Sequence, residues 1–144
     1  MARAFSSNDV IQECETWIGT PYHHQESKKG LGADCVGFIR GVYYNLSGCL
    51  IEDSAYSFDW GDANGNEDLV HQAANYFNEI DPADAMPGDM LGIRWRQKRV
   101  VKHAMIKGHD NLIYHSYNGL GVIKSDFTPY TKLLARAYRF KELV

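Results

Sequence analysis

The chain has 144 residues and a formal net charge of −3, with 44% hydrophobic and 23% charged residues. This length predicts one domain that spans residues 1–144 and buries most of the surface that its unfolded chain exposes. The acidic balance argues against nucleic-acid binding, which usually requires a basic surface. No run reaches the roughly 18 apolar residues of a membrane span, so we expect no membrane insertion.

The N-terminus and the cysteines indicate where the chain is made. The first residues lack the apolar core of a secretory signal, so we expect no signal peptide and synthesis in the cytoplasm. The three cysteines show no disulfide-framework spacing. Cys14 shares an apolar helical face with Trp17, and we expect it in the core. Cys49 follows a predicted helix, and we expect it to be structural too.

The first half of the chain reads as helices and loops. Apolar residues recur there at helical spacing, and glycines or proline mark the ends of each segment. In chain order, the predicted elements are a helix with Ser7 or Asn8 as N-cap and Gly19 at its end, a loop from Thr20 to Gly32, a helix from Asp34 as cap to Gly48, a loop over 50–66 and a helix over 67–78.

From Asp89 onward the pattern changes to short apolar runs separated by turn residues, which indicates strands. Helices first and strands afterwards are typical of an α+β fold, here with a mostly antiparallel sheet of five to six strands. The expected strands are Met90–Trp95, Val100–Lys107, Leu112–Tyr117, Val122–Ser125 and Arg136–Phe140, with turns over 96–99, 108–111 and 118–121.

Cys35 is the candidate nucleophile. It lies in the first turn of the second predicted helix, directly after a Gly-rich loop. The thiolate is the reactive form of cysteine, and a helix N-terminus lowers the thiol pKa through its dipole and unpaired N–H groups. A cysteine at a helix start is nevertheless more often structural. Whether Cys35 is catalytic therefore depends on which side chains lie near it.

Two histidines lie on adjacent predicted strands joined by the turn over 108–111. If the paired residue numbers sum to about 218, His103 faces His115 directly, with Cβ atoms roughly 5 Å apart. His103 can then accept the Cys35 thiol proton while His115 holds its orientation and tautomer. Tyr22 and the Cys35 backbone N–H are candidate donors to the oxyanion that forms.

The sequence contains no recognisable metal-binding motif. Neither Cys-x-x-Cys nor His-Glu-x-x-His spacing occurs, and the adjacent His23 and His24 point in different directions. We therefore expect no cofactor and no metal. His23 and His24 follow Tyr22 and are candidates for lining a substrate groove, with surface loop positions as the alternative. The candidate substrate-binding residues are Asp34, Val36, His23 and His24.

Five segments, in order, resemble motifs of the NlpC/P60 family of cysteine peptidases, papain-like enzymes that cut peptidoglycan stem peptides. These segments are Trp17–Tyr22, Asp34–Phe38, Pro87–Leu91, Lys102–Ile106 and Ile113–Ser116. They lie within about residues 10–140, nearly the whole chain. The resemblance implies a papain-like NlpC/P60 domain with a Cys35–His103–His115 triad and Tyr22 at the oxyanion site.

The resemblance also implies a substrate and a context. In the family the target is often the γ-D-glutamyl link to the diamino acid of the stem peptide. The Trp17–Tyr22 and Lys102–Ala104 stretches look most like a phage and gene-transfer-agent branch. We therefore expect a cell-wall hydrolase that a phage tail delivers, with phage tail proteins as partners.

One departure from the family pattern concerns specificity. Val36 follows the nucleophile where bacterial members usually carry Ser, so a polar group near the substrate is lost. Two alternative functions stay open. One is an N-acetylmuramoyl-L-alanine amidase, and the other is a structural tail-tip component with an idle site.

Overall fold

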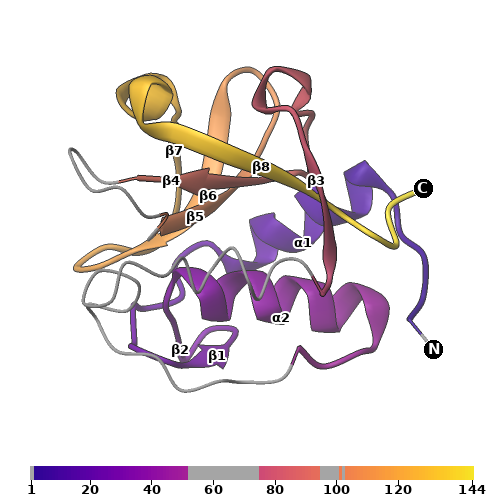
Figure 1. Ribbon diagram of the computed structural model, residues 1–144. Coiled ribbons are helices and arrows are strands. Elements are labelled where there is room, and N and C mark those ends of the chain that lie inside the picture. The colour runs from indigo at the N-terminus through magenta and orange to yellow at the C-terminus, as the bar shows by residue number, and fades with distance from the viewer. Residues whose placement is uncertain (1, 52–74, 95–100, 102) are drawn as a thin grey trace.

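A computed structural model of the chain describes residues 2–51, 75–94, 101 and 103–144. Within these residues, two α-helices lie on one side of a six-stranded sheet, below it in Figure 1. Neighbouring strands of this sheet run antiparallel, which confirms the predicted α+β class. The helices are α1 (Ser7–Trp17) and α2 (Cys35–Ser47), and the sheet order is β3 (Phe77–Ile80), β8 (Leu134–Phe140), β4 (Met90–Ile93), β5 (His103–Lys107), β6 (Leu112–Tyr117) and β7 (Gly121–Asp126).

Helix α1 begins earlier than predicted. Ser6 is its N-cap, because the Ser6 hydroxyl accepts from the Asp9 N–H and the Asp9 carboxylate accepts from the Ser6 N–H. This reciprocal capping box satisfies two groups that an N-cap at Ser7 or Asn8 would leave open. The predicted end is correct, since Gly19 follows the C-cap with a φ of 93°.

Helix α2 has the predicted ends. Asp34 caps it by accepting the Gly37 N–H at 2.7 Å, and Gly48 closes it in the left-handed region. Gly37 is needed for space, because a Cβ there would lie 1.7 Å from the backbone oxygen of Glu26. At 13 residues α2 is too short to span a bilayer, and no helix of the described residues is long and apolar enough to do so.

The main sheet has six strands, within the predicted five to six, but one of them was not among the predicted ranges and not every bound matches. β6 has the predicted bounds, whereas β7 and β8 are each two residues longer. The end of the predicted helix over 67–78 is wrong, because Phe77 starts β3 and pairs with Phe140 of β8. Residues 75 and 76 form a turn, whereas residues 67–74 of that helix, the turn over 96–99 and nearly all of the loop over 50–66 lie outside the described residues.

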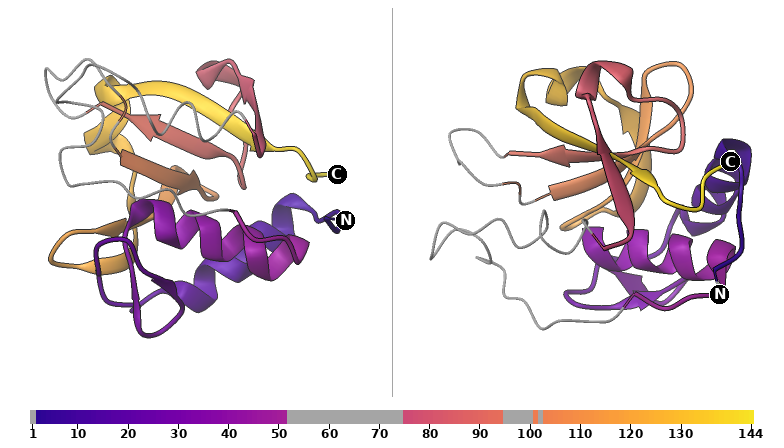
Figure 2. Two further views of the ribbon diagram at one scale, coloured as in Figure 1. Left: turned by 60° about the horizontal axis from the view of Figure 1, so that its bottom comes forward. Right: turned by 45° about the vertical axis from the view of Figure 1, so that its right-hand side comes forward.

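Four short elements were not predicted. They are the hairpin of β1 (Ser27–Lys28) and β2 (Gly32–Ala33) and the 3₁₀ helices η1 (Pro82–Asp84) and η2 (Thr128–Leu133). The hairpin lies in the loop that leads to Cys35, and η2 connects β7 to β8. Figure 2 shows η2 on the side of the sheet away from the helices. Each element has too few residues for a recognisable period, so pattern alone does not reveal it.

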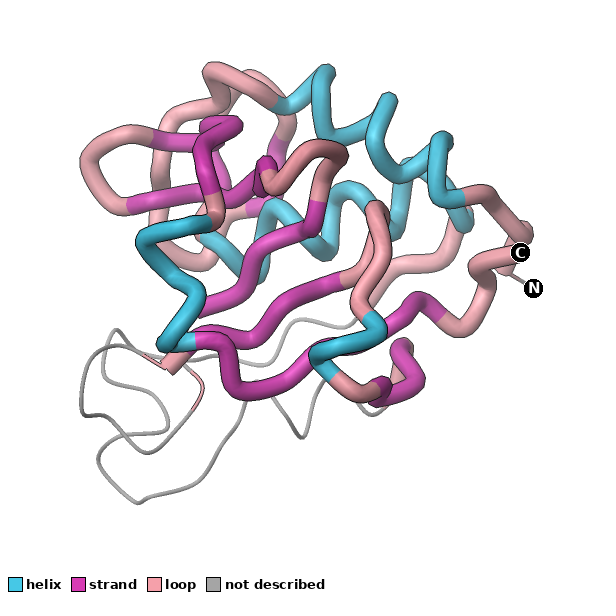
Figure 3. The backbone as a smooth tube through the Cα atoms, turned by 90° about the horizontal axis from the view of Figure 1, so that it is seen from above, coloured by secondary structure: helices cyan, strands magenta, loops and turns pink. Residues whose placement is uncertain are grey.

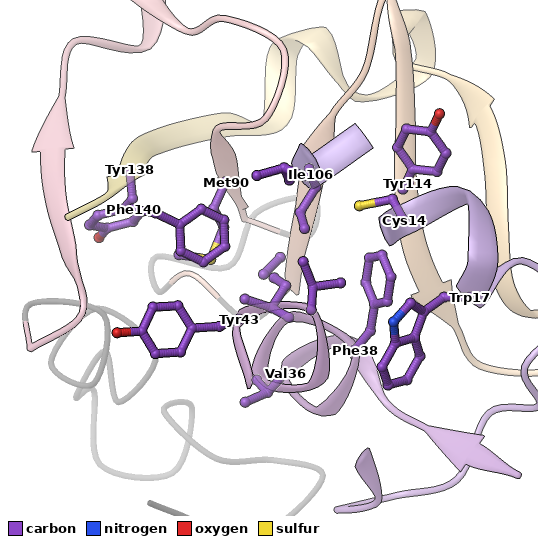
Figure 4. Close-up of a cluster of buried hydrophobic side chains, with 14 of the residues drawn as sticks. Cys14, Trp17, Val36, Phe38, Tyr43, Met90, Ile106, Tyr114, Tyr138 and Phe140 are labelled. Atoms are coloured by element: carbon purple, nitrogen blue, oxygen red, sulfur yellow. The ribbon is translucent and has the colours of Figure 1, made fainter. Parts of the chain in front are cut away.

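The hydrophobic core lies between the helices and the sheet. Phe38 of α2 packs edge-on against Trp17 of α1 at 5.7 Å between ring centroids, and Cys14 is fully buried beside them, as predicted. Figure 4 shows these side chains gathered with Met90 and Ile106 of the sheet. A second apolar cluster covers the opposite face, where side chains of the η2 region pack against the strands.

The two ends of the chain lie side by side, as Figure 3 shows. Phe5 donates its N–H to Glu142 at 3.2 Å, and Val144 donates to Phe5 at 3.0 Å. The Phe5 ring is buried against Phe140 at 5.3 Å between centroids. These contacts attach the N-terminal segment to the end of β8 and so help to hold the helices against the sheet.

Candidate active site

The loop before α2 brings Tyr22 back toward the helix start. The Ala33 N–H donates to the Pro21 oxygen at 2.9 Å, so the segment before the hairpin is tied to its second strand. Thr20, which directly precedes Pro21, anchors the loop through two more hydrogen bonds. Its carbonyl accepts the Val122 N–H at 2.8 Å, and its hydroxyl accepts the Gly30 N–H at 2.9 Å. This anchoring explains how Tyr22 reaches a site 13 residues further along the chain.

Cys35 is the first residue of α2, and its sulfur reaches the start of β5. The backbone N–H of Ala104 is a hydrogen-bond donor to this sulfur, together with the N–H groups of Val36 and Cys35 itself. Ala104 directly follows His103, so the sulfur lies at the end of β5 that begins with His103. Ladder pairing of β5 with β6 occurs at Ile106 and Lys107, away from this end.

The protonation state of the thiol differs from the expectation. Burial, with a further contribution from the Asp34 carboxylate, raises the pKa of Cys35 to about 12. Cys35 is half-buried, and loss of solvation is the largest cause of this shift. The N–H groups of the helix start do lower this pKa, as predicted from sequence, but loss of solvation outweighs them. The thiol is therefore neutral in the resting protein.

The two histidines are in contact, but through a different register. Ile106 pairs with Tyr114 and Lys107 with Ile113, so paired numbers sum to 220 rather than 218. The Gly108 N–H bonds the Leu112 oxygen at 2.8 Å, which leaves a three-residue turn. This shift by two residues keeps both imidazoles on one face, as diagonal instead of directly opposite neighbours.

The diagonal placement still joins the rings. His103 Nε2 lies 2.7 Å from His115 Nδ1, with ring centroids 5.0 Å apart. Burial lowers the pKa of His103 to about 3, helped by the neighbouring charge of His115, and burial lowers the pKa of His115 to about 4. Both imidazoles are therefore neutral near pH 7, and one of them donates to the other.

Tyr22 keeps its proton. Burial, and then the charges of Cys35 and Asp34, raise the pKa of its phenol to about 12. The influence of both groups places Tyr22 at the start of α2. A neutral phenol can donate a hydrogen bond to developing negative charge, which is what an oxyanion site requires.

The predicted substrate-binding residues occupy different environments. Asp34 is buried and structural, since its carboxylate also accepts the Gln25 N–H at 2.7 Å. His24 Nδ1 lies 3.8 Å from this carboxylate and remains partly open to solvent. His23 is exposed. Val36 is 7% exposed and belongs to the core cluster, so direct substrate contact through its side chain is not supported.

Three residues that the sequence did not single out lie around His115. Ser125 Oγ of β7 lies 3.5 Å from His115 Nε2. The rings of Tyr117 and Tyr130 stand edge-on to the imidazole, at 5.7 and 5.6 Å between centroids. These residues come from β6, β7 and η2 and carry no motif. A correct β6–β7 register, which pairs Ile113 with Ser125, would have placed Ser125 diagonally across from His115.

The part of the chain that the structure describes holds no group of three or more His, Cys, Asp or Glu residues placed to bind a metal ion. Acid–base and nucleophilic chemistry is available to the side chains that are present. A thiol, a pair of neutral imidazoles and a protonated phenol are the components of such a site.

Comparison with known proteins identifies the family. The NlpC/P60 family model matches residues 19–139, whereas no curated protein matches the chain. The chain aligns with the crystal structure of the NlpC/p60 domain of the peptidoglycan hydrolase SagA at 21% identity and a TM-score of 0.67, covering 94% of this chain and 100% of that one.

Two further structures share the fold over part of their length. An NlpC/P60 family protein from Bacillus cereus has 22% identity and a TM-score of 0.72, covering 95% of this chain and 41% of that one. The peptidoglycan hydrolase RipB from Mycobacterium tuberculosis has 18% identity and a TM-score of 0.63, covering 92% and 63%. The chain thus spans less than two thirds of these two proteins. The family model covers most of the chain, and the papain-like fold agrees with it: the chain belongs to the NlpC/P60 family.

Proposed function

We propose that the chain is a cysteine endopeptidase that hydrolyses an amide bond in peptidoglycan stem peptides through a thioester. The observation that carries the proposal is the 2.7 Å contact between His103 and His115 at the end of β5 where Ala104 meets the Cys35 sulfur. Membership of the NlpC/P60 family supports it, as does the naming of SagA and RipB as peptidoglycan hydrolases.

The first half-reaction forms the acyl-enzyme. His103 Nε2 contacts His115, so the Cys35 proton passes to Nδ1 of His103 as the sulfur attacks the carbonyl carbon. The carbonyl π electrons move to oxygen, where the Tyr22 hydroxyl and the Cys35 N–H donate hydrogen bonds. The C–N bond then breaks, and the leaving nitrogen takes the proton from His103.

The second half-reaction uses the same groups. His103 accepts a proton from water, whose oxygen attacks the thioester carbon, and the proton returns to sulfur as the C–S bond breaks. Because the resting thiol and imidazole are both neutral, proton transfer accompanies attack rather than preceding it. His115 stabilises the imidazolium that exists between these steps.

The bond and the biological setting are the finer parts of the proposal. We infer cleavage of the γ-D-glutamyl–diamino acid link from the resemblance to the family as a whole. We infer delivery by a phage tail from the resemblance of the Trp17–Tyr22 and Lys102–Ala104 stretches to the phage branch. His23 and His24 are the candidates for contacting the stem peptide. Val36 is buried, so its effect on specificity would act through the packing of α2.

Digestion of purified sacculi tests the proposal. Products analysed by mass spectrometry should contain disaccharide that still carries L-Ala-D-Glu. Cys35→Ala should abolish these products while keeping the circular dichroism of the wild type, and Cys49→Ala, the matched cysteine control, should retain them. Release of naked glycan would indicate the amidase instead. An unchanged sacculus would indicate a structural component.

A further inference from the structure

His115 has a separate partner at each ring nitrogen. Its Nδ1 contacts His103 Nε2 at 2.7 Å, and its Nε2 contacts Ser125 Oγ at 3.5 Å. The second distance is longer than an ordinary hydrogen bond, as is common for contacts in a site without substrate. The three side chains form a chain of contacts that leads away from Cys35 across β5, β6 and β7.

Protons can be arranged along this chain in two directions. A neutral imidazole has one N–H and one lone pair. In the first direction, His103 Nε2–H donates to His115 and His115 Nε2–H donates to Ser125. In the second direction, the Ser125 hydroxyl donates to His115 and His115 Nδ1–H donates to His103. Both directions satisfy both contacts, so geometry alone does not choose between them.

Only the first direction supports catalysis. It places the proton of His103 on Nε2, which leaves a lone pair at Nδ1 to receive the thiol proton. The second direction places a proton on Nδ1 of His103 and blocks that transfer. The direction of the hydrogen bond at Ser125, on a different strand from either histidine, is therefore linked to the basicity of His103 Nδ1, the atom that accepts the thiol proton in the proposed mechanism.

We propose that Ser125 is a positioning residue, which accepts a hydrogen bond from His115 Nε2–H and so stabilises the tautomer in which His103 can act as the base. This inference rests on the proposed function. His115 is fully buried, so an N–H without a partner at Nε2 would be costly. Ser125 is half-buried and can supply the acceptor.

Three other elements also contribute side chains around His115. His103 of β5 uses the opposite ring nitrogen. Tyr117 of β6 and Tyr130 of η2 stand edge-on to the ring, at 64° and 79° between planes, and Ile123 pairs with His115 across the β6–β7 ladder. Ser125 Oγ lies 3.5 Å from Nε2 and can provide the acceptor there.

The tautomer is read directly by NMR of the protein labelled with ¹⁵N at its histidine side chains. In the wild type we expect His115 to carry its proton on Nε2. In Ser125→Ala that signal should weaken and the Nδ1–H signal should grow. A wild type with its proton on Nδ1 of His115 would overturn the inference. This measurement requires no substrate, so it tests the role of Ser125 even if the proposed activity is absent.

Kinetics on the stem-peptide substrate provide the second readout. Ser125→Ala should lower kcat about fivefold, the worth of one neutral hydrogen bond, and leave KM unchanged. Ser125→Thr keeps the hydroxyl and should restore most of kcat. Lys124→Ala, on the opposite face of β7, serves as the strand control. An active wild type whose kcat survives Ser125→Ala would refute the role of Ser125 and leave the proposed function intact. An inactive wild type would refute the proposed function.

Discussion

The neutral state of the Cys35 thiol predicts an unusual pH dependence of alkylation. The pKa of Cys35 is raised from 9.0 to about 12, chiefly by burial. Three pKa units correspond to about a thousandfold less thiolate at neutral pH than an ordinary thiol contains. Because only the thiolate reacts, Cys35 should react with iodoacetamide far more slowly than free cysteine does.

The assay follows the rate of Cys35 alkylation between pH 6 and pH 10 by mass spectrometry of its peptide. A Cys49→Ala background simplifies the analysis, and Cys14 is fully buried. The rate should rise about tenfold for each pH unit across the whole range, because the range lies below the pKa of Cys35. The slope separates this effect from poor access, since access alone would lower the rate equally at every pH.

The opposite result would be a plateau at or below neutral pH. It would mean that Cys35 and His103 already form a thiolate–imidazolium pair at rest, and that our account of the site is wrong. His103→Gln gives a second check. If the resting pair is neutral, this variant should keep the wild-type slope, as should the control His109→Gln in an exposed turn.

Three further predictions concern stability. Asp89→Asn should lower the free energy of unfolding by about 3 kcal/mol in urea, because buried Asp89 binds Arg139 through two contacts of 3.0 and 2.8 Å. Gly37→Ala should lower the free energy of unfolding by about 3 kcal/mol or more, although alanine is the better helix former, because the added Cβ would lie 1.7 Å from a backbone oxygen. Acid should destabilise the fold between about pH 6.5 and pH 4, since His103 and His115 stay neutral in the fold while an unfolded chain binds their protons. The loss at pH 4 should be on the order of 3 kcal/mol for each histidine, and it should shrink when His115 is replaced by Asn.

Controls and contrary outcomes are specific to each case. Glu79→Gln breaks an exposed pair with Arg136 and should cost less than about 1 kcal/mol, so equal losses for this variant and Asp89→Asn would contradict the burial argument. A Gly37→Ala protein with raised stability would mean that the loop of Glu26 can move aside. A pH dependence unchanged by His115→Asn would assign the acid transition to the carboxylates.

Much of the fold follows from local patterns. The apolar spacing of α1 and α2 and the turn residues around β6 are properties of neighbouring residues, so they predict those elements well. Asp34 and Gly48 mark both ends of α2 by their own backbone preferences. β3 is different, because Phe77 continues a helical pattern and becomes a strand through its pairing with Phe140, far away in the sequence.

In the candidate site, too, some features follow from the local sequence and others from tertiary structure. The sequence by itself determines which chemical groups exist and in what order: a cysteine after an N-cap, two histidines on successive strands and a tyrosine in the preceding loop. Tertiary structure alone decides that the histidines meet diagonally, that Ser125 contacts the second one, and that Cys35 rests as a neutral thiol. Register and solvation both depend on segments far apart in the chain. The charge of a buried group is therefore a property of the folded protein, which no local motif encodes.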